Sequence, residues 1–145
     1  MNMNLDNSKN RLIVKSSTAN LITIRKFINN KAKTYGFSSS ETEDIVLAVD
    51  EACTNIIKHS YHSKPNFDIE ITVSFSDNNF NIKIIDYGET FEPASIKELN
   101  LELYRKQRRV GGLGVYLMKT LMDDVTYSFV KNKYNQVLLI KKLIH

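Results

Sequence analysis

Cysteine, histidine and long hydrophobic runs are all scarce in this sequence of 145 residues. The single cysteine, Cys53, excludes an internal disulfide, so a reducing cytoplasm is the expected setting. No apolar run approaches the ~20 residues that cross a bilayer, and the opening stretch MNMNLDNSKN contains no signal-peptide core. We therefore predict a cytoplasmic protein with no membrane partner.

The three histidines give little support to a metal site. His59 and His62 lie three residues apart, and no second cysteine accompanies them. Structural zinc needs four ligands, so zinc is disfavoured. We expect Cys53 itself to pack in the core, because nothing beside it indicates a catalytic thiol.

Neither sign of charge dominates the chain. Lys and Arg number 20 against 16 Asp and Glu, and the net charge of +4 leaves room for an anionic ligand without requiring nucleic acid. The basic run YRKQRR lacks interleaved aromatics beyond Tyr104, so a solvated loop is its default interpretation. Hydrophobic residues at 42% argue against general disorder, and the length favours one domain over 1–145, with 1–10 flexible.

Hydrophobic periodicity predicts a succession of helices and strands. We expect helices at 18–35, 40–58 and 113–125, and strands at 11–15, 67–75, 80–86, 125–130 and 136–143. The second helix has a capping-box signature, in which Ser40 is the N-cap and Glu43 follows three residues later. The predicted fold is an α/β sandwich, with helices packed on one face of a mostly antiparallel mixed sheet.

The helix over 40–58 carries an acid, an amide and a base on one flank. Glu51, Asn55 and Lys58 are spaced i, i+4 and i+7, which places them together at the margin of the core. A solvated flank explains these residues as well as a binding site does, because polar flanks are the rule on surface helices. The apolar stripe beside them consists of Ile45, Ala48, Val49, Ala52 and Ile56.

Asp86 ends the strand at 80–86 on the side that faces the core. It shares the parity of Ile82 and Ile84, so regular pleating turns its carboxylate inward. An unpaired buried charge costs ~3 kcal/mol or more, so Asp86 needs hydrogen-bond donors there. Gly88 allows a turn or the close approach of a ligand to the backbone. A loop-capping aspartate before glycine is the simpler alternative.

A glycine-rich turn precedes the third predicted helix. Gly111, Gly112 and Gly114 are three of the chain's five glycines, and Arg109 stands beside them. Backbone amides at a glycine-rich helix start form an anion site, which favours phosphate binding over a plain flexible hinge. The stretch matches neither a Walker loop nor a dinucleotide fingerprint.

These three features are chemically complementary. A carboxylate at a strand end can accept a hydrogen bond from an amino group such as that of adenine, and a glycine-rich helix start can bind phosphates. The Asn55 amide can offer oxygen to Mg²⁺, which is usually bound by few protein groups plus phosphate oxygens. Glu51, one turn away, can then accept a proton from an attacking hydroxyl. The polar flank of the helix would thus border a nucleotide pocket.

The stretches DEACTNIIKH, DYGETFEP and GGLGVYLMKTLMDDV resemble the N, G1 and G2 boxes of the GHKL ATPases. The chain most resembles the anti-sigma-factor serine kinases of bacterial partner-switching systems. This resemblance implies a Bergerat-type sandwich that binds ATP and Mg²⁺, frequently as a homodimer. It also implies a protein serine/threonine kinase that phosphorylates a STAS-domain antagonist and alternates between this substrate and an RNA polymerase sigma factor.

Carried over by position, the resemblance gives each polar residue a role. Glu51 would be the general base, Asn55 the magnesium ligand and Asp86 the residue that binds the adenine amino group. Gly88 would shape the base pocket, and residues 88–111 would form a nucleotide lid. The phosphates would be held by Lys58, Arg109, Gly111, Gly112 and Gly114.

Two positions depart from the family pattern. Thr90 stands where much of the wider superfamily has a second glycine after the aspartate. Asn135 and Gln136 stand where the family often has a Gly-Thr pair that enters the last strand, and the water-mediated adenine contact expected from that threonine is not implied here. Asparagine tolerates positive φ, which would preserve the turn.

Alternative functions are distinguishable. A non-catalytic module would use ATP or ADP only to set its conformation for partner binding, so Glu51→Gln would leave its regulation unchanged. The detached catalytic domain of a sensor histidine kinase fits poorly, because only a short segment precedes the first predicted strand. A nucleic-acid-binding domain, which we do not expect, would show steeply salt-dependent affinity.

Overall fold

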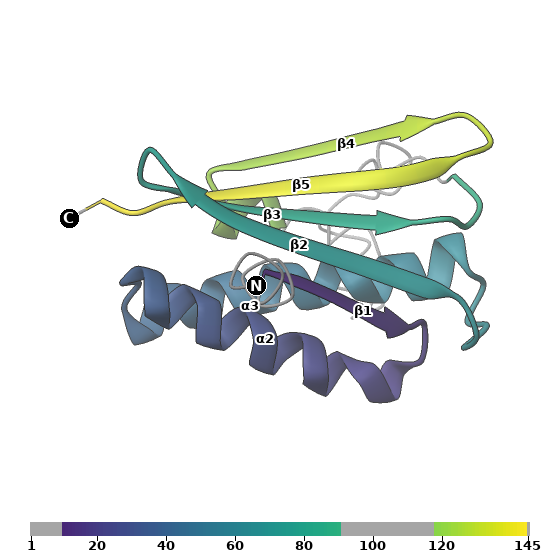
Figure 1. The fold of residues 1–145 in the computed structure, drawn as a ribbon, viewed down its shortest axis with the longest axis horizontal. Coiled ribbons are helices and arrows are strands. Elements are labelled where there is room, and N and C mark those ends of the chain that lie inside the picture. The colour runs from purple at the N-terminus through teal and green to yellow at the C-terminus, as the bar shows by residue number, and fades with distance from the viewer. Residues whose placement is uncertain (1–9, 91–117, 145) are drawn as a thin grey trace, which may run out of the picture.

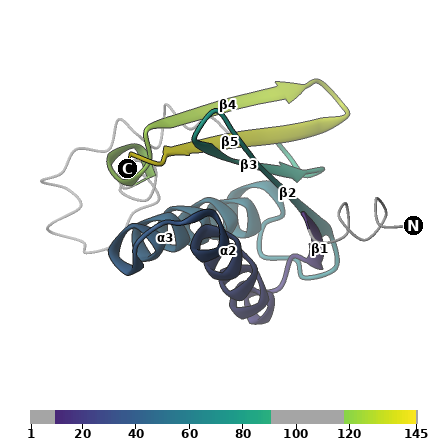
Figure 2. The same cartoon turned by 60° about the vertical axis from the view of Figure 1, so that its left-hand side comes forward.

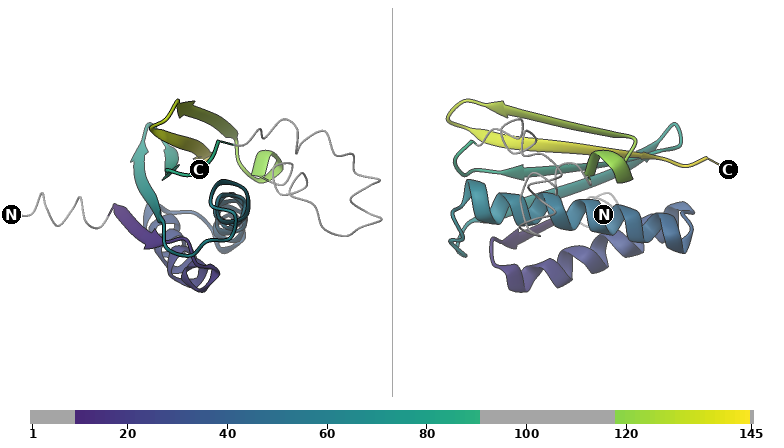
Figure 3. Two further views of the ribbon diagram at one scale, coloured as in Figure 1. Left: turned by 90° about the vertical axis from the view of Figure 1, so that its right-hand side faces the viewer. Right: turned by 180° about the vertical axis from the view of Figure 1, so that it is seen from behind.

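Two long helices pack side by side against one face of a five-stranded sheet (Figure 1). The computed structural model describes residues 10–90 and 118–144. The strands are β1 (Arg11–Lys15), β2 (Asp68–Ser76), β3 (Asn79–Asp86), β4 (Asp124–Val130) and β5 (Tyr134–Lys142), and the helices are α2 (Leu21–Tyr35) and α3 (Ser39–Asn55). Figures 2 and 3 show the helices on one side of the sheet only, so the predicted α/β sandwich is confirmed.

The sheet has the strand order β1-β2-β3-β5-β4. Every pairing among these described strands is antiparallel, so the expectation of a mixed sheet was wrong for this part of the chain. The β2–β3 hairpin turns at Asp77 and Asn78, whose φ angles of 52° and 62° are those of a type I′ turn. The β4–β5 connection turns at Asn132, with a φ of 63°. Asp and Asn tolerate this left-handed backbone. In this strand order β3 is the central strand. Asp86 at its end pairs with residues of both neighbouring strands.

Alternate side chains of the sheet meet the apolar stripes of the two helices to form the core. The pattern follows the period of 2 in the strands and 3.6 in the helices that the sequence predicted. The buried residues include Ile69, Ile71 and Val73 of β2, Phe80, Ile82 and Ile84 of β3, Val137 and Leu139 of β5, Ile24, Ile28 and Ala32 of α2, and Ile45, Ala48, Val49, Ala52 and Cys53 of α3.

The first predicted helix is confirmed, with a short 3₁₀ turn at its start. The turn η1 (Thr18–Asn20) begins after Ser17, whose side chain accepts a hydrogen bond from the Ala19 N–H. The α-helical part, α2, then runs to Tyr35 and ends at Gly36, which has a φ of 106°. A left-handed residue at this position is the usual glycine ending of a helix.

The capping box of α3 is two residues earlier than the sequence analysis placed it. Ser38, not Ser40, is the N-cap: its Oγ accepts the Glu41 N–H at 3.1 Å, and the Glu41 carboxylate accepts the Ser38 N–H at 2.9 Å. Ser38 has the extended backbone of an N-cap, whereas Ser40 already lies inside the helix. Three consecutive serines followed by Glu41 and Glu43 satisfy the motif in two registers, so its spacing could not decide between them.

The helix that was predicted to reach Lys58 changes its winding before it ends. The α-helix stops at Asn55 and continues as a π-helical turn, η2 (Ile56–Ser60). The Tyr61 N–H donates to the Ile56 carbonyl at 3.0 Å, the i to i+5 bond that defines this winding. Ile56, Ile57 and Ser60 of the turn are buried, so the wider turn brings its end against the sheet.

The third predicted helix ends earlier than expected. Residues 118–121 are helical, but β4 begins at Asp124, inside the range assigned to the helix. Two hydrogen bonds to β5 hold this transition: the Asp123 N–H donates to the Ile140 carbonyl at 2.8 Å, and the Asp123 carboxylate accepts the Lys142 N–H at 2.6 Å. Sheet pairing therefore overrides the helical pattern at 122–125. Residues 113–117 lie outside the described part.

Within the described ranges, neither α2 nor α3 nor any other helix combines the length and hydrophobicity that crossing a bilayer requires.

Replacing the true N-cap should destabilise the protein, and replacing its neighbour should not. Ser38→Ala removes the acceptor for the Glu41 N–H, which should cost about 1 kcal/mol and lower the melting temperature by ~3 °C. Ser40→Ala is the matched control, since alanine is the better helix former at an exposed position inside α3. Thermal unfolding followed by circular dichroism measures both, and equal melting temperatures for the two variants would contradict the assignment.

Candidate functional site

Asp86 is the buried charge around which the candidate site is arranged. The residue is 2% exposed at the end of β3 and faces the core, as predicted. Its Oδ1 accepts hydrogen bonds from the Gly88 N–H and from Nδ2 of Asn135, both at 2.9 Å. Burial raises the pKa of Asp86, while these donors and the nearby Ser60 hydroxyl oppose the rise by favouring the carboxylate. The donors that the sequence analysis required are therefore present.

Gly88 lies directly against the π-helical turn η2. A Cβ atom at this residue would stand 2.4 Å from the Ser60 carbonyl oxygen and 2.8 Å from a ring carbon of Tyr61. The following residue, Glu89, donates its N–H to the same Ser60 carbonyl at 2.9 Å. The packing of the chain on itself thus requires glycine here, a reason that the sequence did not reveal. Its predicted role in shaping a base pocket stays a prediction.

Tyr61, which the sequence analysis did not identify, also packs against the segment that follows β3. Its hydroxyl donates to the Asp68 carbonyl at 2.6 Å and accepts the Tyr87 N–H at 2.7 Å, and its ring stacks on Phe67 with centroids 5.0 Å apart. Burial raises the pKa of Tyr61 to about 12, so the hydroxyl stays protonated at neutral pH. The signal in the sequence that could have identified Tyr61 is its position: it is a large aromatic residue between a predicted helix and the next predicted strand.

Asn135, at the start of β5, is the second residue that the sequence analysis did not place in the site. It is the direct ladder partner of Asp86. Its Nδ2 donates to Asp86 Oδ1 at 2.9 Å and to the Gly88 carbonyl at 3.0 Å, and its Oδ1 accepts the Thr90 hydroxyl at 2.6 Å. Thr90 and Asn135, which both depart from the family pattern, are therefore joined by a hydrogen bond. The separation of 45 residues between them hides this contact in the sequence.

The three polar residues on the flank of α3 and η2 differ in burial. Asn55 is 3% exposed, deeper than the margin where the helical pattern placed it, whereas Glu51 is half-buried and Lys58 is exposed. Burial is the main cause that raises the pKa of Glu51; the charge of Asp50 adds to the rise and that of Lys58 opposes it. A carboxylate with a raised pKa is suited to accept a proton.

Asn55 has hydrogen-bonding capacity that the described residues do not satisfy. Its Nδ2 is shielded from solvent and makes no hydrogen bond of good geometry with the described residues. It does lie near the Tyr127 hydroxyl: burial raises the pKa of Tyr127, and Asn55 lowers it in part. The unsatisfied N–H group of this buried amide fits a ligand rich in oxygen atoms. The carboxamide oxygen is the atom that could coordinate Mg²⁺. The described residues contain no cluster of three His, Cys, Asp or Glu that could hold a metal ion.

Charge effects on Cys53 show that α3 lies near the end of β3. Burial raises the pKa of the Cys53 thiol, and the charges of Asp50 and Asp86 raise it further. The thiol is fully buried and protonated, hence unreactive, and its predicted place in the core is confirmed. Asp86 and the polar end of α3 therefore belong to one region of the molecule.

The predicted phosphate side of the pocket lies outside the described residues. Arg109, Gly111, Gly112 and Gly114 fall there, as does the predicted lid beyond Thr90. Their roles stay predictions, and so does the flexibility of residues 1–10, of which only residue 10 is described.

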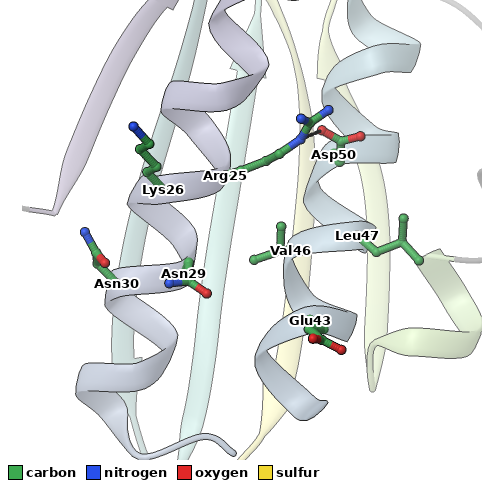
Figure 4. Close-up of a pocket in the computed structure, with 8 residues that line it drawn as sticks. All are labelled: Arg25, Lys26, Asn29, Asn30, Glu43, Val46, Leu47 and Asp50. Atoms are coloured by element: carbon green, nitrogen blue, oxygen red, sulfur yellow. Dashed lines mark hydrogen bonds and ion pairs between the residues drawn. The ribbon is translucent and has the colours of Figure 1, made fainter. Parts of the chain in front are cut away.

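A separate groove of about 520 Å³ lies between α2 and α3. Figure 4 shows its side chains on the helices, with the strands of the sheet behind them. Nε of Arg25 and Oδ1 of Asp50 form an ion pair across it at 2.7 Å. No predicted site residue lines this groove, so it is distinct from the predicted nucleotide pocket. Its lining consists of Arg25, Lys26, Asn29, Asn30, Glu43, Val46, Leu47 and Asp50.

Three comparisons relate the chain to known proteins. Residues 14–141 match the family model of the histidine kinase-like ATPase domain. The chain is 32% identical over 124 residues to the serine-protein kinase RsbW of Oceanobacillus iheyensis, which covers 83% of this chain and 77% of that protein. It is 35% identical over 107 residues to the serine-protein kinase RsbW of Bacillus subtilis, which covers 70% of this chain and 66% of that protein.

Two solved structures share the fold at low sequence identity. The SiaB–SiaC complex from Pseudomonas aeruginosa gives a TM-score of 0.69 at 12% identity and covers 96% of this chain and 95% of that chain. The RsbU and RsbW domains of a Mycobacterium tuberculosis protein give 0.64 at 16% identity and cover 91% of this chain and 32% of that one. With a family model that spans most of the sequence, these matches confirm the resemblance seen in the three motifs: the chain belongs to the histidine kinase-like ATPase domain family, together with the RsbW serine-protein kinases.

Proposed function

We propose that this chain is an ATP-dependent protein serine/threonine kinase that acts as an anti-sigma factor by phosphorylating a STAS-domain antagonist. The RsbW relatives, which are named serine-protein kinases, support the activity. The single observation that carries the proposal is the buried Asp86 carboxylate, kept as an acceptor by donors from Gly88 and Asn135. An acceptor held in this way beside a helix end suits the amino group of adenine.

Glu51 is the residue that we assign to the chemical step. It lies one turn before Asn55 on α3, it is half-buried, and burial raises its pKa. As general base, Glu51 would take the proton from the serine or threonine hydroxyl of the substrate as the oxygen attacks the γ-phosphorus of ATP. The phosphoryl group moves to that oxygen, and ADP leaves.

The remaining predicted residues would hold the phosphates and the cation. Asn55 would bind Mg²⁺ together with phosphate oxygens, and Mg²⁺ would supply charge neutralisation there. Its Nδ2, which no described residue satisfies, would donate to a phosphate oxygen beside the cation. Phosphate contacts are assigned by position to Lys58, Arg109, Gly111, Gly112 and Gly114.

The wider biology belongs to the same proposal. We propose one domain over 1–145 with a nucleotide lid at 88–111, which forms a homodimer in the cytoplasm and binds an RNA polymerase sigma factor when it is not bound to its STAS-domain substrate. A non-catalytic module that only changes conformation with nucleotide is the alternative, and Glu51 separates the two.

Removing the charge of Asp86 should abolish most nucleotide affinity. Asp86→Asn places an amide donor against the amino donor of adenine, and the loss of a charged hydrogen bond should weaken ATP binding by about tenfold or more. Calorimetric titration with ATP and ADP, with and without Mg²⁺, measures this. Asp77→Asn is the matched control, because it makes the same change in the β2–β3 turn, where asparagine also tolerates positive φ. Unchanged affinity in Asp86→Asn would sink the proposal.

Glu51→Gln should separate phosphotransfer from binding. Transfer of phosphate from labelled ATP to bacterial STAS-domain proteins should fall by about 10²–10⁴-fold, while calorimetry shows nearly unchanged ATP affinity. The control is Glu43→Gln, an exposed site on the same helix. Because the base works only when deprotonated, the wild-type rate should fall as pH drops through the raised pKa of Glu51, above its ordinary value near 4.5. Full transfer activity in Glu51→Gln would favour another base, and transfer absent from the wild type would favour the non-catalytic module.

A further inference from the structure

We propose that Asn135 is a positioning residue that orients Asp86 for recognition of a 6-aminopurine and thereby sets the base selectivity of the site, with Thr90 anchoring the Asn135 amide. This inference rests on the function proposed above and names a determinant of its nucleotide specificity. Neither the family resemblance nor any matched relative assigns a role to Asn135.

The β3–β5 ladder places Asn135 beside Asp86. The two residues are direct partners in this antiparallel pair, so their side chains project from the same face of the sheet. On β5 that face also carries the buried Val137 and Leu139, whereas Gln136 projects from the opposite face. The Asn135 amide therefore reaches the carboxylate without any distortion of the strand.

The three partners of Asn135 fix which way its amide points. Nδ2 faces two acceptors, Asp86 Oδ1 at 2.9 Å and the Gly88 carbonyl at 3.0 Å, and Oδ1 faces a donor, the Thr90 hydroxyl at 2.6 Å. A reversed amide would set its carbonyl oxygen against two acceptors. The two acceptors therefore set the orientation, and the Thr90 hydroxyl, which can donate or accept, anchors the amide in it by donating to Oδ1.

As a consequence, the two carboxylate oxygens of Asp86 have different roles. Oδ1 receives both the Gly88 and the Asn135 donors, which holds the carboxylate plane and leaves Oδ2 as the oxygen for an additional donor. The two bonds also favour the ionised form against the effect of burial. An ionised, fixed carboxylate accepts from an amino group and has nothing to donate to a 6-oxo group, so the pair selects adenine.

A purely structural role for Asn135 makes a different prediction. If the amide only pinned the start of β5, its loss would loosen the site for every nucleotide alike. If it orients Asp86, its loss would weaken only those nucleotides that present an amino group. The selectivity between two nucleotides that differ in this group alone therefore decides the matter.

The experiment compares ATP with purine riboside 5′-triphosphate, which lacks the 6-amino group. Calorimetric titration of the full chain with each nucleotide and Mg²⁺ gives the ratio of the two dissociation constants. Wild type should favour ATP by about tenfold or more, and Asn135→Ala should reduce that preference by about tenfold, through loss of ATP affinity alone. Thr90→Val, which removes the hydroxyl at constant shape, should reduce it about threefold.

Gln136→Ala is the matched control, because the adjacent side chain lies on the other face of β5, and it should keep the wild-type ratio. Circular dichroism checks that each variant is folded, and Thr90→Val carries the test if Asn135→Ala is not. Equal weakening of both nucleotides by Asn135→Ala, or a wild type that binds ATP without preference, would overturn the inference while leaving nucleotide binding in place. A wild type that binds neither nucleotide at millimolar concentration would instead remove the proposed function itself.

Discussion

A carboxylate buried at the end of the central strand is the constraint on which the rest of this region depends. Asp86 is almost inaccessible to solvent, and leaving its charge unpaired would cost several kcal/mol, ~3 or more. Two separate segments donate hydrogen bonds to this carboxylate: the backbone two residues later at Gly88 and the paired strand at Asn135. A group this costly to bury and this well supplied with donors is typical of a binding site.

Contacts of Gly88 and Tyr61 join the helix layer to the sheet near the end of β3 that carries Asp86. Gly88 packs on the Ser60 carbonyl, and the Tyr61 hydroxyl connects the backbones on either side of the β2–β3 hairpin at Asp68 and Tyr87. Asn55 lies in the turn just before η2 with part of its polar surface unsatisfied by the described residues. The fold thus presents a fixed acceptor on the sheet side and an open polar group on the helix side of one region.

Local patterns predicted much of this arrangement. The alternation along 67–75 and 80–86 identified the core face and turned Asp86 inward, and the polar flank of α3 identified Glu51 and Asn55. Spacing failed where two registers satisfied one motif, as with Ser38 and Ser40. It also failed where the partner was distant in sequence: Asn135 meets Asp86 only because β3 and β5 are neighbours, a fact of topology. No periodicity announces the change to π winding after Asn55 either, since the buried residues continue through it.

The π-helical turn has a consequence for how this segment can vary. Each residue added to or removed from a helix rotates everything after it by roughly 100°. The π turn, however, uses one residue more than an α turn does for about the same rotation. A single deletion between Asn55 and Tyr61 that restored α winding would therefore leave Ser60 and Tyr61 directed toward Gly88 and Asp68. An insertion there would instead rotate Ser60 and Tyr61 away from Gly88 and Asp68. The segment can therefore lose one residue over evolutionary time more readily than it can gain one.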